Sequence, residues 1–134
     1  MTPSASKPRR TIVIVEDDFL IAAGYRVVCE ELGVEVLAVC DSAEEGFAAV
    51  ATHEPTYALL DMHLAGDKDG VSIALAIWQN EIETSVIFAT GSLDPASLDR
   101  LCHTGPYKLL MKPIDPADFE NALTTAPELA THRA

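Results

Sequence analysis

The sequence predicts an α/β fold: a doubly wound, five-stranded parallel sheet with helices on both faces. Five short apolar segments alternate with five segments whose apolar residues recur at helical spacing. The connections between them are only a few residues long, which suits strands that run in one direction and are joined by helices. The total of 134 residues fits one domain of this kind.

The five predicted strands are short apolar runs that stop at polar or turn-forming residues. The first, TIVIV, is β-branched throughout, as expected of a strand that is buried on both faces. The third, YALLD, ends on a carboxylate, and the fifth, YKLLM, is followed by Lys-Pro. In chain order the predicted strands cover 11–15, 34–39, 57–61, 85–90 and 107–111.

Residues that favour helix N-caps mark where the first two helices begin. Apolar spacing predicts the first helix over about 19–32, and we interpret Asp18 as its N-cap rather than as a metal ligand. The second helix follows Asp41 or Ser42, either of which can cap it through a side-chain oxygen, and it runs to about residue 53.

Turn-forming residues delimit the last three helices. The third is expected at about 71–80, and the fourth, whose helical pattern is weaker, at about 95–103. The fifth begins at Asp115 or Asp118 and runs to about residue 125. All five helices lie between strands or after the last strand, which is the alternation that a parallel sheet requires.

The chain is acidic: 21 Asp+Glu residues against nine Lys+Arg give a net charge of −12 at pH 7. Because such a surface repels phosphate backbones, we expect no nucleic-acid partner. No apolar run approaches the roughly 20 residues of a membrane span, and the N-terminal MTPSASKPRR lacks the apolar core of a secretory signal. We therefore expect a cytoplasmic protein without membrane contact. Its expected parts are a flexible tail over 1–10, a domain over 11–127 and a C-terminal tail over 128–134.

Cysteines and histidines are not arranged as metal ligands. The cysteines lie far apart without a CxxC pair, so we expect buried thiols rather than a disulfide or a zinc site: Cys29, Cys40 and Cys102. Three histidines on predicted helices or on the tail share no spacing, which argues against a metal site built from them: His53, His103 and His132.

Polar side chains stand where four of the predicted strands end. Glu16 and Asp17 follow the first strand, Asp61 closes the third, Thr90 the fourth, and Lys112 follows the fifth. The carboxyl ends of parallel strands share one edge of the sheet, so these groups should lie close together. Clustered carboxylates call for a hard divalent cation with oxygen ligands, such as Mg²⁺. A carboxylate beside such a cation can attack phosphorus and carry the phosphoryl group.

Four motifs taken together resemble the receiver domain of two-component response regulators, a CheY-like domain with a flavodoxin-like fold. They are VEDD at 15–18, LLD at 59–61, FATG at 88–91 and KP at 112–113. The resemblance covers about residues 10–127, and the set of motifs in this order is highly specific although each alone is weak.

The resemblance assigns expected roles to individual residues. It implies that Asp61 is the phosphoacceptor, that Asp17 is a direct metal ligand and that Glu16 acts through water. The backbone carbonyl of His63 is implied as the third protein ligand. The metal is expected to be Mg²⁺, or Mn²⁺ in its place.

The other implied roles fall on the fourth and fifth strands. Thr90 matches the switch hydroxyl and Lys112 the lysine that pairs with the phosphate. A cis peptide is implied between Lys112 and Pro113, and an X-Pro bond adopts that form at low cost.

Departures from the usual receiver pattern concern the switch and the loop after Asp61. Leu109 stands where an aromatic residue is usual, and Tyr107 lies two residues earlier on the same face. Ala65 replaces the usual proline, and Gly70 lies one residue further from Asp61 than is common. These features resemble the FAT GUY subgroup of stand-alone receivers.

Several residues have two interpretations. His63 and Ser92 occupy the two positions that tune hydrolysis of the acyl phosphate in this family, although Ser92 departs from the subgroup and His63 is equally well an exposed loop residue. Asp67 and Asp69 are expected to be solvated loop residues. Trp78 is expected in the core or at its boundary.

The resulting hypothesis is a single-domain response regulator, a phosphoacceptor rather than an enzyme. Its expected phosphodonor is a sensor histidine kinase or a histidine phosphotransfer protein. Its expected output is a protein contact through the face of the fourth helix, fifth strand and fifth helix. Two alternatives are a pseudo-receiver that only docks, and an Asp-nucleophile phosphohydrolase. The latter needs a second Asp two residues after the nucleophile, where this chain has His63. For Asp17, Asp61 and Lys112, the alternative is a surface ion-pair network.

Overall fold

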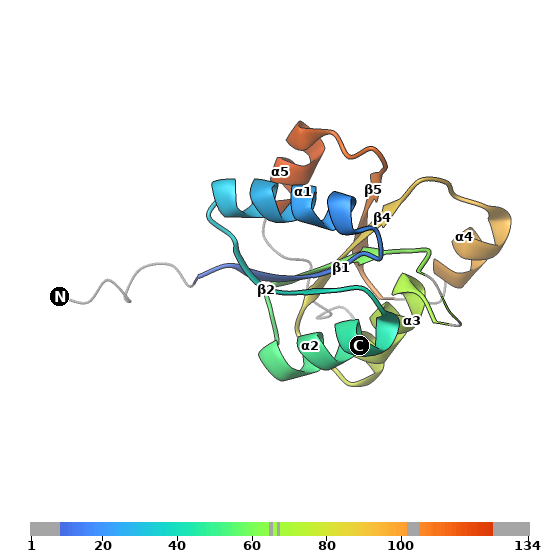
Figure 1. The fold of residues 1–134 in the computed structure, drawn as a ribbon. Coiled ribbons are helices and arrows are strands. Elements are labelled where there is room, and N and C mark those ends of the chain that lie inside the picture. The colour runs from blue at the N-terminus through green and yellow to red at the C-terminus, as the bar shows by residue number, and fades with distance from the viewer. Residues whose placement is uncertain (1–8, 65, 67, 102–104, 125–134) are drawn as a thin grey trace.

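A computed structural model describes residues 9–64, 66, 68–101 and 105–124, and it confirms the predicted α/β architecture. Five parallel strands form one sheet in the order β2-β1-β3-β4-β5. Helices α1 and α5 cover one face of the sheet, and α2 and α3 cover the other (Figure 1). No helix among these residues is long and apolar enough to cross a bilayer.

The observed elements match the predicted ones closely. The strands are β1 Thr11–Val15, β2 Glu35–Cys40, β3 Tyr57–Asp61, β4 Ser85–Thr90 and β5 Tyr107–Met111. The helices are α1 Phe19–Glu31, α2 Ala43–His53, α3 Gly70–Gln79, α4 Pro95–Leu101 and α5 Pro116–Thr124. The main shifts are that β2 starts and ends one residue later than expected and that α3 starts one residue earlier.

Caps settle the alternatives at the helix starts. The Asp18 carboxylate accepts hydrogen bonds from the backbone N–H groups of Leu20 and Ile21, as expected of an N-cap. Ser42, and not Asp41, caps α2. Asp115 takes the corresponding place before α5, where its carboxylate accepts from the N–H of Ala117 at 2.8 Å.

The sheet separates two apolar clusters. Alternate residues of β1, β3 and β4 point to opposite faces, and almost all of them are buried. One cluster lies under α2 and α3 and includes Trp78, which is 8% exposed, while the other lies under α1 and α5. Cys29 and Cys40 are buried free thiols, as predicted, and burial raises the pKa of Cys29 to about 12. Cys102 lies outside the described residues.

Two residues of the expected N-terminal tail, Arg9 and Arg10, contact the domain. The guanidinium of Arg10 donates to the backbone carbonyls of Leu32, at 3.1 Å, and of Leu123. Arg9 forms an ion pair with Glu35 at 3.0 Å. These contacts join the start of the chain to the ends of α1 and α5. The tails predicted over 1–10 and 128–134 fall wholly or partly outside the described residues, since 1–8 and 128–134 are not among them.

Asp69 is not a solvated loop residue, which corrects the sequence-based expectation. Its carboxylate caps α3 by accepting from the N–H of Ser72 at 3.1 Å. It also receives two hydrogen bonds from the guanidinium of Arg100 on α4, at 2.6 and 3.0 Å. Burial raises the pKa of Asp69, but these hydrogen bonds outweigh it and the net pKa is lowered. Asp67 lies outside the described residues.

The lowered pKa of Asp69 predicts an acid-sensitive contribution to stability. A carboxylate with a depressed folded-state pKa stabilises the fold above its unfolded pKa of about 3.9, and this contribution is lost as pH falls through the folded pKa. Asparagine keeps the helix cap but does not titrate. We therefore expect the free energy of unfolding of wild type to exceed that of Asp69→Asn at pH 7, and the gap to shrink below about pH 4.

Urea denaturation followed by circular dichroism between pH 3 and 7 measures this gap. Asp115→Asn is the matched control, because it also replaces an N-cap carboxylate with an amide. A gap between wild type and Asp69→Asn that is constant over this range would contradict the prediction.

Candidate functional site

The predicted polar residues do meet at one edge of the sheet. Carboxylate oxygens of Glu16, Asp17 and Asp61 all lie within 4.8 Å of one another. Glu16 and Asp61 are buried, at 3% and 5% exposure, whereas Asp17 is exposed. β1 delivers the first two residues and β3 the third, and these strands are neighbours in the sheet.

Lys112 lies between the two buried carboxylates. Its Nζ is 2.9 Å from Glu16 Oε1 and 3.3 Å from Asp61 Oδ2. Burial lowers the pKa of Lys112, but the hydrogen bond to Glu16 and the nearby negative charges outweigh it, so the net pKa is raised. Burial also raises the pKa of Glu16, against the opposite effect of Lys112. The ammonium therefore stays charged and holds both carboxylates in place.

Backbone N–H groups hold the other carboxylate oxygens. Glu16 Oε2 accepts from the N–H of Asp18 at 3.1 Å, so the residue that caps α1 also orients Glu16. Asp61 Oδ1 accepts from the N–H of His63 at 3.1 Å. The side chain of His63 is exposed beside this loop. Each buried carboxylate thus has one oxygen on the ammonium and one on the backbone.

Thr90 lies at the end of β4, fully buried. Its hydroxyl donates to the backbone carbonyl of Ser92 at 2.7 Å and accepts from the N–H of Ser92 at 3.3 Å. The backbone N–H of Lys112 donates to the carbonyl of Thr90 at 2.7 Å, which joins the ends of β4 and β5. Any new acceptor for the Thr90 hydrogen must therefore compete with Ser92.

Gly70 contributes to the site although it has no side chain. A Cβ at this position would stand 2.2 Å from the carbonyl oxygen of Asp61 and 2.9 Å from its carbonyl carbon. Only glycine allows the first turn of α3 to approach the Asp61 backbone so closely. Sequence reasoning noted the unusual spacing of Gly70 but missed this contact, which depends on how the loop after β3 closes.

On β5, Leu109 stands opposite Phe88 and is half-buried against the cluster under α2 and α3. The ring of Tyr107 packs edge-on against Phe88, with centroids 5.5 Å apart and planes at 66°. The peptide bond between Lys112 and Pro113 is cis.

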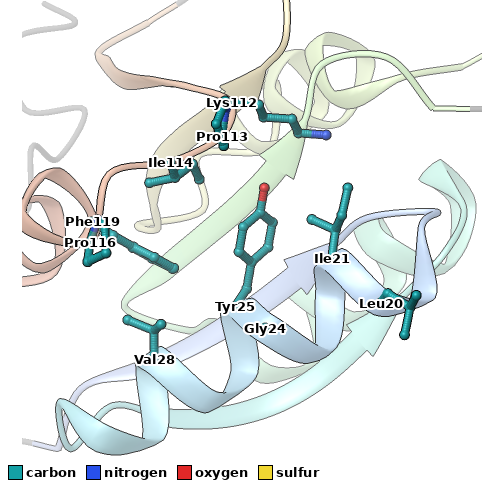
Figure 2. Close-up of a pocket in the computed structure, with 10 residues that line it drawn as sticks. All are labelled: Leu20, Ile21, Gly24, Tyr25, Val28, Lys112, Pro113, Ile114, Pro116 and Phe119. Carbon is teal, nitrogen blue, oxygen red and sulfur yellow. The ribbon is translucent and has the colours of Figure 1, made fainter.

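Sequence reasoning also missed a pocket that adjoins the site. Its volume is about 470 Å³, and side chains of α1 and of the segment after β5 line it. Figure 2 shows Tyr25 rising from α1 between Ile21 and Ile114, with its hydroxyl directed toward Lys112. Burial raises the pKa of Tyr25 to about 12, so its hydroxyl stays protonated at neutral pH.

The donor set fits a hard divalent cation. If all three carboxylates are ionised, they carry three negative charges, and Lys112 supplies one positive charge. The remaining two negative charges are what one divalent ion neutralises. All three residues offer oxygen, the ligand that Mg²⁺ and Mn²⁺ prefer, and the exposed Asp17 leaves one side open to water. Within the described part of the chain, this is the only group of three acids, histidines or cysteines so arranged.

The fold and the site define an α/β domain with an acidic site at the carboxyl ends of its strands, and comparison with known proteins gives its family. The model of the response regulator receiver domain matches residues 12–124. The chain belongs to this family of two-component signalling proteins.

Named relatives support the assignment. The acid tolerance regulatory protein ActR of Sinorhizobium medicae is 30% identical over 120 residues, which are 90% of this chain and 61% of ActR. A probable C4-dicarboxylate response regulator, DctR of Halalkalibacterium halodurans, is 26% identical over 93% of this chain and 54% of DctR. This chain thus spans about half to three fifths of the length of these relatives.

Solved structures agree with this result. The signal receiver domain of a modulated diguanylate cyclase from Desulfovibrio desulfuricans is 32% identical, with a TM-score of 0.78 over 85% of this chain and 90% of that one. A CheY-like receiver domain protein from Methanospirillum hungatei is 25% identical, with a TM-score of 0.77 over 85% of this chain and 90% of that one.

The close contact between Gly70 and Asp61 predicts that adding a methyl group at position 70 destabilises the fold. Gly70→Ala forces α3 and the Asp61 backbone apart, at a cost of about 1–3 kcal/mol in unfolding free energy. It should also shift the amide resonances of Asp61 and His63. Urea denaturation and two-dimensional NMR measure the two effects.

Gly24→Ala is the matched control, because a Cβ in the middle of α1 meets no atom within 4 Å. It should stabilise the protein by about 0.5–1 kcal/mol through helix propensity. If Gly70→Ala proved as benign as Gly24→Ala, the proposed close packing against Asp61 would be wrong.

Proposed function

We propose that this domain accepts a phosphoryl group on Asp61 from a phosphohistidine. The observation that carries the proposal is the group of three carboxylates with Lys112 at the strand ends. In the transfer, a carboxylate oxygen of Asp61 bonds to phosphorus while the P–N bond breaks, and its electron pair remains on the imidazole nitrogen. The product is an acyl phosphate on Asp61.

We assign the divalent ion to Glu16, Asp17, Asp61 and the backbone carbonyl of His63, with Asp17 binding directly and Glu16 through water. When bound, Mg²⁺ or Mn²⁺ neutralises charge on the phosphoryl oxygens. The clustering supports this assignment, because three carboxylates gather within 4.8 Å of one another around a single ammonium group. The position of Glu16 against Lys112 suits an indirect role better than a direct one.

Lys112 and Thr90 act on the phosphoryl group after transfer. The Lys112 ammonium, 3.3 Å from Asp61 Oδ2, stands where it can pair with a phosphoryl oxygen. The Thr90 hydroxyl donates its hydrogen to the phosphoryl group in place of the Ser92 carbonyl. His63 and Ser92 flank this position and set how readily water reaches the acyl phosphate.

Two other functions are less well supported. A phosphohydrolase needs a general acid two residues after the nucleophile, and His63 occupies that position in place of the second Asp. A pseudo-receiver that only docks would have no use for the buried ion pairs that hold Asp61. The family match favours a signalling domain over an enzyme.

We propose a sensor histidine kinase or a histidine phosphotransfer protein as the phosphodonor. The expected output is a protein contact through α4, β5 and α5, in the cytoplasm and without nucleic acid. The extent of the domain, 11–127, its single-domain character and its place in the FAT GUY subgroup stay predictions.

Asp61→Asn should abolish phosphoryl uptake, because the neutral amide is a much weaker nucleophile than the carboxylate that it replaces. The measurement is incorporation of radiolabelled phosphate from a phosphorylated histidine kinase in the presence of Mg²⁺. Asp118→Asn, an exposed acid on α5, is the control of equal charge change and should incorporate label like wild type. Label on Asp61→Asn would place the acceptor elsewhere, and no label on wild type with any donor would favour the docking-only alternative.

Asp17→Asn should weaken Mg²⁺ binding roughly tenfold from a wild-type affinity in the millimolar range or tighter. The reason is that the variant loses the exposed carboxylate of the metal site while the buried pair with Lys112 stays intact. Titration with MgCl₂ followed by NMR gives both dissociation constants, again with Asp118→Asn as control. Equal affinities for Asp17→Asn and wild type would remove Asp17 from the ligand set.

A further inference from the structure

The ion pair between Asp69 and Arg100 joins two segments that are 31 residues apart in the sequence. Both terminal nitrogens of the guanidinium contact the carboxylate: Nη1 lies 2.6 Å from Oδ2 and Nη2 lies 3.0 Å from Oδ1. Such two-point pairs fix orientation as well as distance. Figure 1 shows α4, which carries Arg100, to the right of α3, which Asp69 caps.

One end of this pair is tied to the backbone of Asp61. The residue after Asp69 is Gly70, whose Cα approaches the Asp61 carbonyl so closely that a Cβ would stand 2.2 Å from the oxygen. The Asp69 carboxylate also holds the N–H and the hydroxyl of Ser72, at 3.1 and 3.3 Å. Arg100 is therefore hydrogen-bonded to the start of α3, which packs against the backbone of Asp61.

The other end of the pair, Arg100, lies on α4, which follows Thr90 and Ser92 along the chain. β4 ends at Thr90, whose hydroxyl donates to the carbonyl of Ser92 at 2.7 Å, and α4 begins three residues after Ser92. A hydroxyl has one hydrogen to donate. If Thr90 gives that hydrogen to a phosphoryl group, the Ser92 carbonyl loses its donor and the chain leading into α4 is released.

We propose that the Asp69–Arg100 pair is a latch that holds α4 in the arrangement of the unphosphorylated domain and opposes its rearrangement when Asp61 is modified. Asp69 and Arg100 are positioning residues in this scheme, because neither touches the reacting atoms. The inference rests on the proposed function and adds a regulatory element to it.

The short length of α4 makes its position depend on contacts such as the pair between Asp69 and Arg100. The helix has only seven residues, and a helix this short depends on tertiary contacts for its stability. Its buried side chains include Ser97 and Leu101, at 6% and 3% exposure. The Asp69 side chain is 19% exposed and that of Arg100 is 43% exposed, so water screens the pair in part. Loss of the pair therefore removes one of the contacts that fix α4.

Linkage gives the latch a signature that a simple structural contact lacks. If the pair stabilises only the unmodified arrangement, its removal lowers the free energy needed to reach the other arrangement and so tightens binding of a phosphoryl mimic. A contact that merely supports the fold has the opposite effect or none. The direction of the change thus separates the two roles.

The experiment is a titration of the full chain with beryllofluoride in excess Mg²⁺, followed by two-dimensional NMR. Arg100→Gln and Asp69→Asn each break the pair, and the asparagine keeps the α3 cap. We expect both variants to bind beryllofluoride about two- to five-fold more tightly than wild type, since partly exposed pairs carry modest energies. The double variant should match either single variant, because the second change removes nothing further.

Arg9→Gln is the matched control: it breaks the 3.0 Å pair with Glu35 at the amino ends of β1 and β2 and should bind like wild type. Unchanged or weaker binding by Asp69→Asn overturns the latch, even if Arg100→Gln does not fold. Tightening by Arg9→Gln to the same degree also overturns it, as a general charge effect. Absence of Mg²⁺-dependent binding in wild type would instead contradict the proposed function.

Discussion

The structure depends above all on the placement of one ammonium group between two buried carboxylates. Lys112 lies within 3.3 Å of Asp61 and within 2.9 Å of Glu16. Without that charge, two acids at 5% exposure or less would have to repel each other in a medium that screens them poorly. The order of strands, with β3 between β1 and β4, and β4 next to β5, is what brings residues from opposite ends of the chain to this point.

The same arrangement places three carboxylates around one ammonium group. Lys112 contacts the two buried carboxylates, and Asp17, the third acid of the group, faces solvent. In the proposed function, a divalent ion adds positive charge at this site and a phosphoryl group adds negative charge. In the proposed function, the net charge of the site changes as these ligands bind. Lys112 and the backbone N–H groups of Asp18 and His63 keep the two buried carboxylates oriented.

The fold and most of the site were predictable because they follow from local patterns. Apolar runs and capping residues set the elements, and the carboxyl ends of parallel strands must share an edge, which places Asp61 and Lys112 together. The rest was not predictable because it depends on loop closure or on distant parts of the chain. Gly70 packs on Asp61 through the path of a loop, and Arg100 reaches Asp69 across 31 residues. Arg10 meets Leu123 across 113 residues.

Leu109 on β5 differs from the usual receiver pattern, and this difference bears on how Asp61 could be coupled to α4. Leu109 stands opposite Phe88, half-buried against the core, and it has no polar group that could be satisfied in both an inward and an outward position. A ring that changes sides is therefore not available to carry a signal at this position. Among the described residues, the backbone that leaves Thr90 and the ion pair between Asp69 and Arg100 both link the surroundings of Asp61 to α4. In the proposed scheme, a receiver with leucine here transmits through the segment between β4 and α4, because that segment follows Thr90 and leads into α4.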